Sequence, residues 1–170
     1  MNQRFVPFAI AATVFLLDRI TKSVIKGHFS AWDTRIVIPN FFNIVHTENP
    51  GIAFGLLTNA PGWWRDALLI GFSGAVLIGI STMLLKSGVS GLQGTLLRSA
   101  LGLVLGGAAG NLFDRIMSGT VTDFLEFHAG ESYFFPAFNV ADSAIFCGAC
   151  LLLLDMWRSR ETKSQAALDS

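Results

Sequence analysis

Four apolar segments, each long enough to cross a lipid bilayer, restrict this chain to very few possible folds. They lie at about residues 5–25, 67–85, 96–113 and 139–157. A spanning helix needs roughly 20 predominantly apolar residues, and an α-helix satisfies its backbone hydrogen bonds within one segment. The sequence therefore predicts an all-α membrane protein in which four transmembrane helices form one domain over residues 1–158, followed by a polar tail over residues 159–170.

The first apolar segment has the order of a signal peptide, with Arg4 ahead of the apolar run Phe5–Leu17. Asp18 and Arg19 follow the run directly, and no clear small-x-small cleavage site precedes them. A cleavable leader normally carries such a site. We therefore expect this segment to be a retained membrane helix.

The composition supports the membrane assignment. Hydrophobic residues make up 52% of the 170 and charged residues 14%, whereas a soluble domain is about 25% charged. The formal net charge is zero, which argues against binding to nucleic acid. Cys147 and Cys150 lie within an apolar segment, so we interpret them as packing residues rather than a redox pair. Gly102, Gly106 and Gly110 follow the small-xxx-small pattern that lets helix backbones approach closely.

Lysine and arginine are distributed unevenly between the two sides of the predicted bundle. The side with both termini carries Arg4, Lys86, Arg98, Arg158, Arg160 and Lys163, and the other carries Lys26, Arg35, Arg65 and Arg115. By the positive-inside rule, both termini are expected in the cytoplasm, with loops 27–66 and 116–137 outside. Residues 35–38 and 41–46 are predicted to be short strands of a small β element on the outer membrane surface. The tail after Trp157 is expected to be disordered.

With this topology, nearly every polar residue near the spans falls in the outer leaflet. The group comprises Asp18, Lys22, Glu48, Asn49, Asn111, Asp114, Arg115, Asp123, Asn139 and Asp142. Charged groups at membrane depth are costly, so each one needs either a functional role or a partner. Asp18 and Lys22 lie four residues apart on one helix face and are expected to form a structural ion pair. Asp114 and Arg115 are interpreted as structural too.

Asp123 and Asp142 are the candidate catalytic residues. Two neighbouring carboxyls cannot both ionise, so one keeps a proton near neutral pH, and the pair can activate water against a peptide bond. Asp142 could instead belong only to a helix N-terminus, with Asn139 as the N-cap. Asp123, between Thr122 and Phe124 in an apolar stretch, has no such structural explanation.

Two other functions stay open on the sequence. The stretch 71–74 reads G-F-S-G and matches the pattern of intramembrane serine proteases, with Ser73 as nucleophile. Such a site needs a histidine on a neighbouring helix as base, and His28, His46 and His128 fall in predicted loops. The second alternative is a non-catalytic proton-relay or ion-conducting subunit. No H-E-x-x-H motif is present, so we expect neither a metal nor a cofactor.

Five blocks of the sequence together match one known family. They are L-D-R-I-T-K (17–22), E-N-P-G-I-A-F-G (48–55), G-N-L-F-D-R (110–115), V-T-D-F (121–124) and F-P-A-F-N-V-A-D-S (135–143). With these blocks in order over about residues 10–157, the chain resembles the lipoprotein signal peptidases, or signal peptidase II, of bacterial inner membranes. The resemblance implies a multi-pass enzyme of four helices with a small periplasmic β-cradle and an active site near the periplasmic leaflet.

The resemblance also implies an activity and a set of site residues. The family removes signal peptides from prolipoproteins whose cysteine already carries diacylglycerol, using an aspartate pair and no cofactor. By motif position, Asp123 and Asp142 match that pair. The expected supporting and substrate-binding residues are Asp18, Lys22, Asn49, Gly51, Asn111, Arg115, Asn139 and Ala141.

The same resemblance names partners and one departure. It implies contact with membrane lipids and inhibition by globomycin-type cyclic peptides, and we expect a monomer. Pro50 and Ile52 stand where many members have Thr and Ala, so contacts with inhibitor or substrate are expected to differ in detail there. Apolar residues of the second outer loop are expected to exclude water or hold acyl chains. They are Phe124, Phe127, Phe134 and Phe135.

Overall fold

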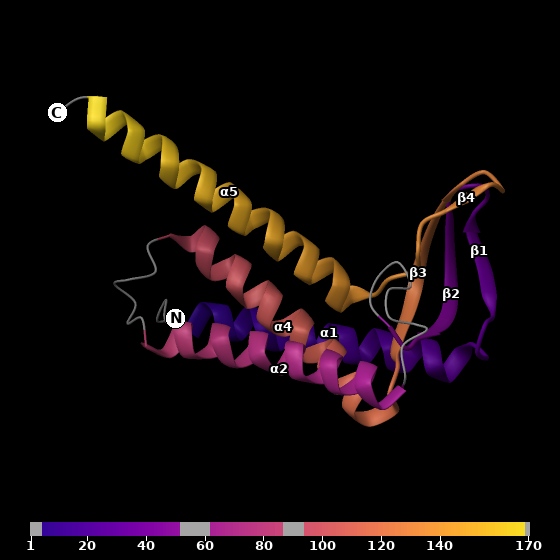
Figure 1. The fold of residues 1–170 in the computed structure, drawn as a ribbon. Helices are drawn as coiled ribbons and strands as arrows, with labels where there is room; N and C mark the ends of the chain where they lie inside the picture. Colours follow the sequence, from indigo (N-terminus) through magenta and orange to yellow (C-terminus); the bar gives the residue numbers. More distant parts are fainter. Residues whose placement is uncertain (1–4, 52–61, 87–93, 169–170) are drawn as a thin grey trace.

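The computed structural model describes residues 5–51, 62–86 and 94–168. Within them, long helices stand beside one small antiparallel sheet (Figure 1). The helices are α1 (Val6–His28), α2 (Gly62–Lys86), α4 (Thr95–Ser118) and α5 (Val140–Leu168). All the predicted helices are therefore confirmed. The disorder expected after Trp157 is wrong, because α5 continues to Leu168 through residue types that favour helix, such as Arg, Glu, Lys, Gln and Ala.

Three of the described helices are long and apolar enough to cross a membrane, namely Gly62–Lys86, Thr95–Ser118 and the Val140–Ser159 part of α5. In α1 the apolar character is interrupted by Asp18, Arg19 and Lys22. The chain is therefore a membrane protein with several apolar helices. The four-span count and the cytoplasmic placement of both termini stay predictions.

Glycines bring α4 into close contact with α1 on one side and α5 on the other. A Cβ added to Gly106 would lie 2.6 Å from the carbonyl oxygen of Ala11 in α1. A Cβ added to Gly107 would lie 2.4 Å from the carbonyl oxygen of Ala141 in α5. Both distances are below van der Waals contact, so only glycine permits these helix separations. The packing predicted from the small-xxx-small pattern is confirmed.

α2 packs more loosely than the other helices. It contacts α4, yet among its described side chains only Leu69 and Leu84 are buried. Large apolar side chains such as Phe72 and Ile78 are exposed on it. A helix that is apolar on all sides and little buried by protein is suited to face lipid.

The sheet consists of β1 (Thr34–Ile38), β2 (Phe42–Asn49), β3 (Val121–Ala129) and β4 (Tyr133–Phe134), antiparallel in that order. It stands at the end of the bundle where α1 and α4 end and α5 begins (Figure 1). The strands predicted in the first outer loop are confirmed. No strand was predicted in the second outer loop, where the structure places β3 and β4. Its residues 121–124 are all buried, so they lack the alternation that marks a half-exposed strand.

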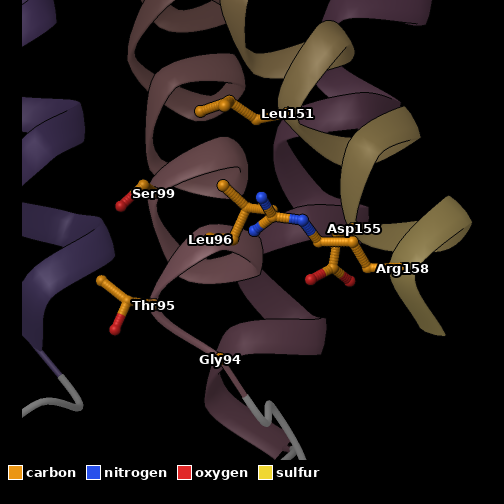
Figure 2. A pocket seen from close by; sticks show the side chains of 7 residues that line it. All are labelled: Gly94, Thr95, Leu96, Ser99, Leu151, Asp155 and Arg158. Atoms are coloured by element: carbon orange, nitrogen blue, oxygen red, sulfur yellow. The ribbon is translucent and has the colours of Figure 1, made fainter. Parts of the chain in front are cut away.

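A hollow of about 600 Å³ lies at the opposite end of the bundle, between the start of α4 and the later turns of α5 (Figure 2). Its lining residues are Gly94, Thr95, Leu96, Ser99, Leu151, Asp155 and Arg158. Thr95 precedes Asn111 on α4 by 16 residues, which is roughly 24 Å along a helix. The hollow is therefore separate from the polar cluster at the sheet end.

Candidate active site

Asp123 lies near the start of β3 and has only 3% of its surface exposed. Its Oδ2 accepts a hydrogen bond from Asn49 Nδ2 at 3.0 Å, and its Oδ1 accepts one from Asn139 Nδ2 at 2.7 Å. The β2–β3 register brings Asn49 close, because Thr47 is the strand partner of Asp123. A strand position and two amide donors therefore fix this carboxyl.

Asp142 lies in the first turn of α5. Its Oδ1 accepts a hydrogen bond from Asn111 Nδ2 at 2.7 Å, and its Oδ2 accepts one from the backbone N–H of Asn139 at 3.2 Å. The side-chain oxygen of Asn139 in turn accepts from the Asp142 N–H at 2.9 Å. These reciprocal bonds have the geometry of a helix cap. The capping role expected of Asn139 is confirmed, and Asn139 also hydrogen-bonds to an oxygen of each carboxyl.

Asn49, Asn111 and Asn139 each turn the NH2 group of the side-chain amide, and not its oxygen, toward the carboxyls of Asp123 and Asp142. A neighbouring donor holds each amide oxygen: Gly51 N–H for Asn49, Asp142 N–H for Asn139, and Lys22 Nζ for Asn111. A backbone N–H or an ammonium can only donate, so the oxygen of each amide must face it. The carboxyl pair therefore receives N–H donors from three side chains.

A buried ionic cluster of α1 and α4 supports this arrangement. Lys22 Nζ lies 2.8 Å from Asp18 Oδ2 and 2.7 Å from Asp114 Oδ2. Asp114 also forms an ion pair with Arg19. Asp18 and Lys22 are fully buried, and Asp114 is 2% exposed. The predicted pair of Asp18 and Lys22 is confirmed, and the structure adds Asp114 and Arg19 to it.

The remaining predicted residues are joined to the site by hydrogen bonds that each involve one backbone group and one side chain. Arg115 Nη2 donates to the carbonyl oxygen of Gly51 at 3.3 Å, and the guanidinium interacts electrostatically with both Asp142 and Asp123. The N–H of Ala141 donates to Asp18 Oδ1 at 3.0 Å. Pro50 directly precedes Gly51 in the chain, and Ile52 lies outside the described residues. Every residue predicted for the site therefore lies in one connected group.

Asp123 titrates far from the ordinary range of a carboxyl. Burial raises its pKa to about 7, and the neighbouring Asp142 adds to the rise. Hydrogen bonds from Asn49 and Asn139 and the positive charge of Lys22 act in the opposite direction. Because its pKa lies near neutrality, this group can both hold and release a proton at physiological pH.

Glu48 joins the two strands that carry Asn49 and Asp123. Its carboxylate accepts hydrogen bonds from Thr120 Oγ1 at 2.6 Å and Thr122 Oγ1 at 3.2 Å, and it contacts His46 Nε2 at 3.0 Å. Burial alone would raise the pKa of Glu48, but these hydrogen bonds and the charge of Lys26 together lower it. This contact could not be predicted from sequence, since Glu48 and Thr120 lie 72 residues apart.

The serine alternative gains no support from the structure. Ser73 lies in α2, whereas His28 ends α1, His46 lies in β2 and His128 lies in β3. All three were placed in the loops between the predicted spans. His46 lies in the strand predicted there, whereas His28 belongs to α1 and His128 to a strand that was not predicted. The ring nitrogens of the histidines contact backbone carbonyls and Glu48 instead of Ser73. Among the described residues, no group of three or more His, Cys, Asp or Glu could hold a metal ion.

Comparison with known proteins identifies the family. The family model described as signal peptidase (SPase) II matches residues 10–158. This chain belongs to the signal peptidase II family. Three lipoprotein signal peptidases illustrate the similarity. That of Solibacter usitatus is 46% identical over 96% of both chains, that of Maridesulfovibrio salexigens is 40% identical over 94% of this chain and all of its own, and that of Pseudomonas aeruginosa is 41% identical over 92% and 90%.

Solved structures agree with the signal peptidase II assignment. A bacterial membrane enzyme determined by the in meso method superposes with a TM-score of 0.78 at 28% identity, over 92% of this chain and 90% of that one. A second such structure gives a TM-score of 0.74 at 28% identity, over 88% and 91%. The resemblance drawn from the five sequence blocks is therefore confirmed, and this signal peptidase II is a membrane protease.

Proposed function

We propose that this protein is an aspartyl endopeptidase that removes signal peptides from diacylglyceryl-modified prolipoproteins, with Asp123 and Asp142 as its catalytic residues. One observation carries the proposal. Asn139 hydrogen-bonds to an oxygen of each carboxyl, through its side chain to Asp123 and through its backbone to Asp142. The neighbouring Asp142 also raises the pKa of Asp123, as expected when two close carboxyls cannot both ionise easily.

The reaction needs one carboxyl protonated and the other ionised. The ionised carboxyl takes a proton from a water molecule, whose oxygen attacks the carbonyl carbon of the scissile bond. The protonated carboxyl gives its proton to the carbonyl oxygen, so a tetrahedral gem-diol forms. Collapse of the gem-diol breaks the C–N bond and passes a proton to the leaving amine, and the pair regains its single shared proton. Two carboxyls supply all the acid–base steps.

The surroundings of the two acids favour different protonation states. Asp142 lies at the N-terminus of α5, where the helix dipole and the N–H of Asn139 stabilise a carboxylate. Asp123 has a pKa of about 7 and lies on a strand without such a dipole. We therefore place the resting proton on Asp123, although the pair titrates as a unit.

The position of the site suits a lipid-anchored substrate. The carboxyls lie where the helices meet the sheet, so a peptide bond next to a lipidated cysteine would reach them at the membrane surface. Phe127, Phe134 and Phe135 are exposed near this end of the molecule and can contact acyl chains, whereas Phe124 is buried in the core. Membrane lipid and the prolipoprotein are the partners this geometry supports, and globomycin-type peptides are expected to occupy the same place.

The test is cleavage of a purified diacylglyceryl prolipoprotein by separate Asp123→Asn and Asp142→Asn variants. Each is expected to lose activity by about 10³-fold or more, since proton transfer by either acid is removed. Glu131→Gln, the same type of change at an exposed residue, is the control. Cleavage retained by either aspartate variant would contradict the catalytic pair. Loss in a folded Ser73→Ala variant would favour the serine protease, and no cleavage by the wild type would favour a non-catalytic subunit.

A further inference from the structure

The ammonium of Lys22 is fully buried and lies against two carboxylates and one amide. It forms ion pairs with Asp18 Oδ2 at 2.8 Å and Asp114 Oδ2 at 2.7 Å, and it donates a hydrogen bond to Asn111 Oδ1 at 3.0 Å. A buried ammonium is stable only when it is paired and hydrogen-bonded in this way. With Arg19 beside Asp114, the cluster contains two acids and two bases and is electrically neutral.

Asn111 differs from the other two asparagines in what holds its amide oxygen. Backbone N–H groups hold Asn49 and Asn139, so the local fold alone sets their orientation. The Asn111 oxygen accepts from two side chains, Lys22 Nζ at 3.0 Å and, at the longer distance of 3.4 Å, Asn139 Nδ2. If the ammonium moved away, only the longer contact would oppose a turn of the amide that brings its oxygen toward Asp142 and breaks the 2.7 Å hydrogen bond.

Of the two acids paired with Lys22, Asp114 is the one on the same helix as Asn111. Asp114 and Asn111 are three residues apart on α4 and therefore share a helix face, whereas Asp18 is on α1 itself. The ion pair with Asp114 therefore favours a Lys22 ammonium that lies against α4 and Asn111. Arg19 fixes Asp114 from the other side and is itself held 4.5 Å above the ring of Phe113.

We propose that Asp114, oriented by Arg19, is a positioning residue for the cleavage reaction: it holds Lys22 against Asn111 and so keeps the Asn111 NH2 group on Asp142. The inference rests on the proposed function, because it assumes that Asp142 takes part in catalysis. Asp114 itself touches neither carboxyl of the pair. Its effect on the reaction must therefore pass through Lys22 and Asn111.

A double-mutant cycle tests this dependence. Asp114→Asn is made in the wild type and in an Asn111→Ala background, and kcat and KM are measured with the diacylglyceryl prolipoprotein. In the wild type, we expect kcat to fall about 10- to 100-fold, less than the roughly 10²- to 10³-fold typical when a preorganised donor is deleted outright, because Asn111 is displaced and not removed. KM should be nearly unchanged. In the Asn111→Ala background the same change should lower kcat by no more than about twofold, because the group it positions is already absent. An equal loss in both backgrounds, or no loss in the wild type, overturns the proposal.

If Asp114→Asn does not fold, variants of Arg19 provide the same test. The Arg19 side chain is 24% exposed, against 2% for Asp114, so its replacement is expected to disturb the fold less. Arg19→Gln is expected to lower kcat and Arg19→Lys to restore most of it, both effects vanishing in the Asn111→Ala background. A loss that persists in that background, or no loss at all, contradicts the inference. Asp123→Asn and Asp142→Asn are assayed alongside. Activity in either of them refutes the proposed function, whereas their inactivity with an additive cycle refutes only the role of Asp114.

Discussion

α2 differs from α1, α4 and α5 in how its apolar character relates to its burial inside the protein. α2 has the highest hydropathy of the three candidate spans, and only 11% of its span is buried inside the protein. The buried share is 17% in α5 and 50% in α4, and the hydropathy falls in the same order. α1, which carries the buried Asp18 and Lys22, is interrupted most of all by charge. The helices that hold the site thus look least like membrane spans.

The reason for this difference is physical. Lipid is as apolar as a hydrophobic core, so a helix that faces lipid has to be apolar on every side. A helix that faces other helices can carry charged residues, provided that they pair across the interface. Lys22 meets this condition through Asp18 and Asp114. In this protein, low hydropathy within a long helix therefore marks the functional part of the bundle.

Lys22→Met is expected to lower stability more than any other variant that tests this difference between α2 and the charge-bearing helices. It leaves the buried carboxylate of Asp18 without its counter-charge and Asp114 with Arg19 alone, and removing one partner of a buried ion pair costs about 3–5 kcal/mol. We expect the variant to unfold in detergent well below the wild-type Tm. Ser73→Ala in α2 is the matched change outside the cluster, with an expected effect within about 0.5 kcal/mol. Equal Tm values for the two variants would show that the charges in α1 are not structural.

The dependence of stability on pH sharpens the comparison further. Apart from Arg65 and Asp66 near its start and Lys86 at its end, α2 has no charged residue, so titration effects should come from the site region. Burial raises the pKa of Asp123 from 3.8 to about 7. The folded state therefore binds this proton more tightly than the unfolded state, and stability falls as the pH rises between these two values.

The expected size is at most roughly 4 kcal/mol over that interval, from about 1.36 kcal/mol for each unit of pKa difference. In Asp123→Asn this decline should be absent, so its Tm should exceed that of the wild type by a margin that grows up to about pH 7 and is constant above it. Thermal unfolding at several pH values measures the margin. Parallel curves for the two proteins would contradict the burial of a protonated Asp123.

Glycine replacement in α4 and in α2 gives the smallest of the three effects. A Cβ on Gly107 would meet the Ala141 carbonyl oxygen at 2.4 Å, whereas a Cβ on Gly74 in α2 would meet nothing within 4 Å. Gly107→Ala is therefore expected to lower stability by about 1–3 kcal/mol and to reduce cleavage by moving the start of α5. Gly74→Ala should be neutral or stabilising, by up to about 1 kcal/mol. A tolerated Gly107→Ala would mean that α4 and α5 can separate without harm to the site.

The sequence was a good guide wherever the signal is local. Span length identified the helices, and the depth of the polar residues brought Asp18, Asn111, Asp123 and Asp142 together before any coordinates were considered. The family blocks then identified the reaction class. These features depend on residues close in sequence, or on their distance from a span end, and both can be counted directly.

Contacts between distant segments could not be predicted in this way. Arg19 and Asp114 are 95 residues apart, and no spacing rule relates one to the other. β3 was missed because its first residues are buried on both faces and resemble any short apolar run. The structural role expected of Asp114 came without its partners, Arg19 and Lys22, because both lie on α1.

The reciprocal hydrogen bonds between Asn139 and Asp142 make the start of a helix and the assembly of the site a single event. Winding the first turn of α5 uses the same N–H groups and oxygens that hold the carboxyl of Asp142, and it brings the Asn139 side chain to that of Asp123. The first turn of α5 therefore cannot unwind without releasing Asp142 from Asn139. The hydrogen-exchange rate of the Asp142 backbone amide would report how often this part of the site opens, without any need for substrate.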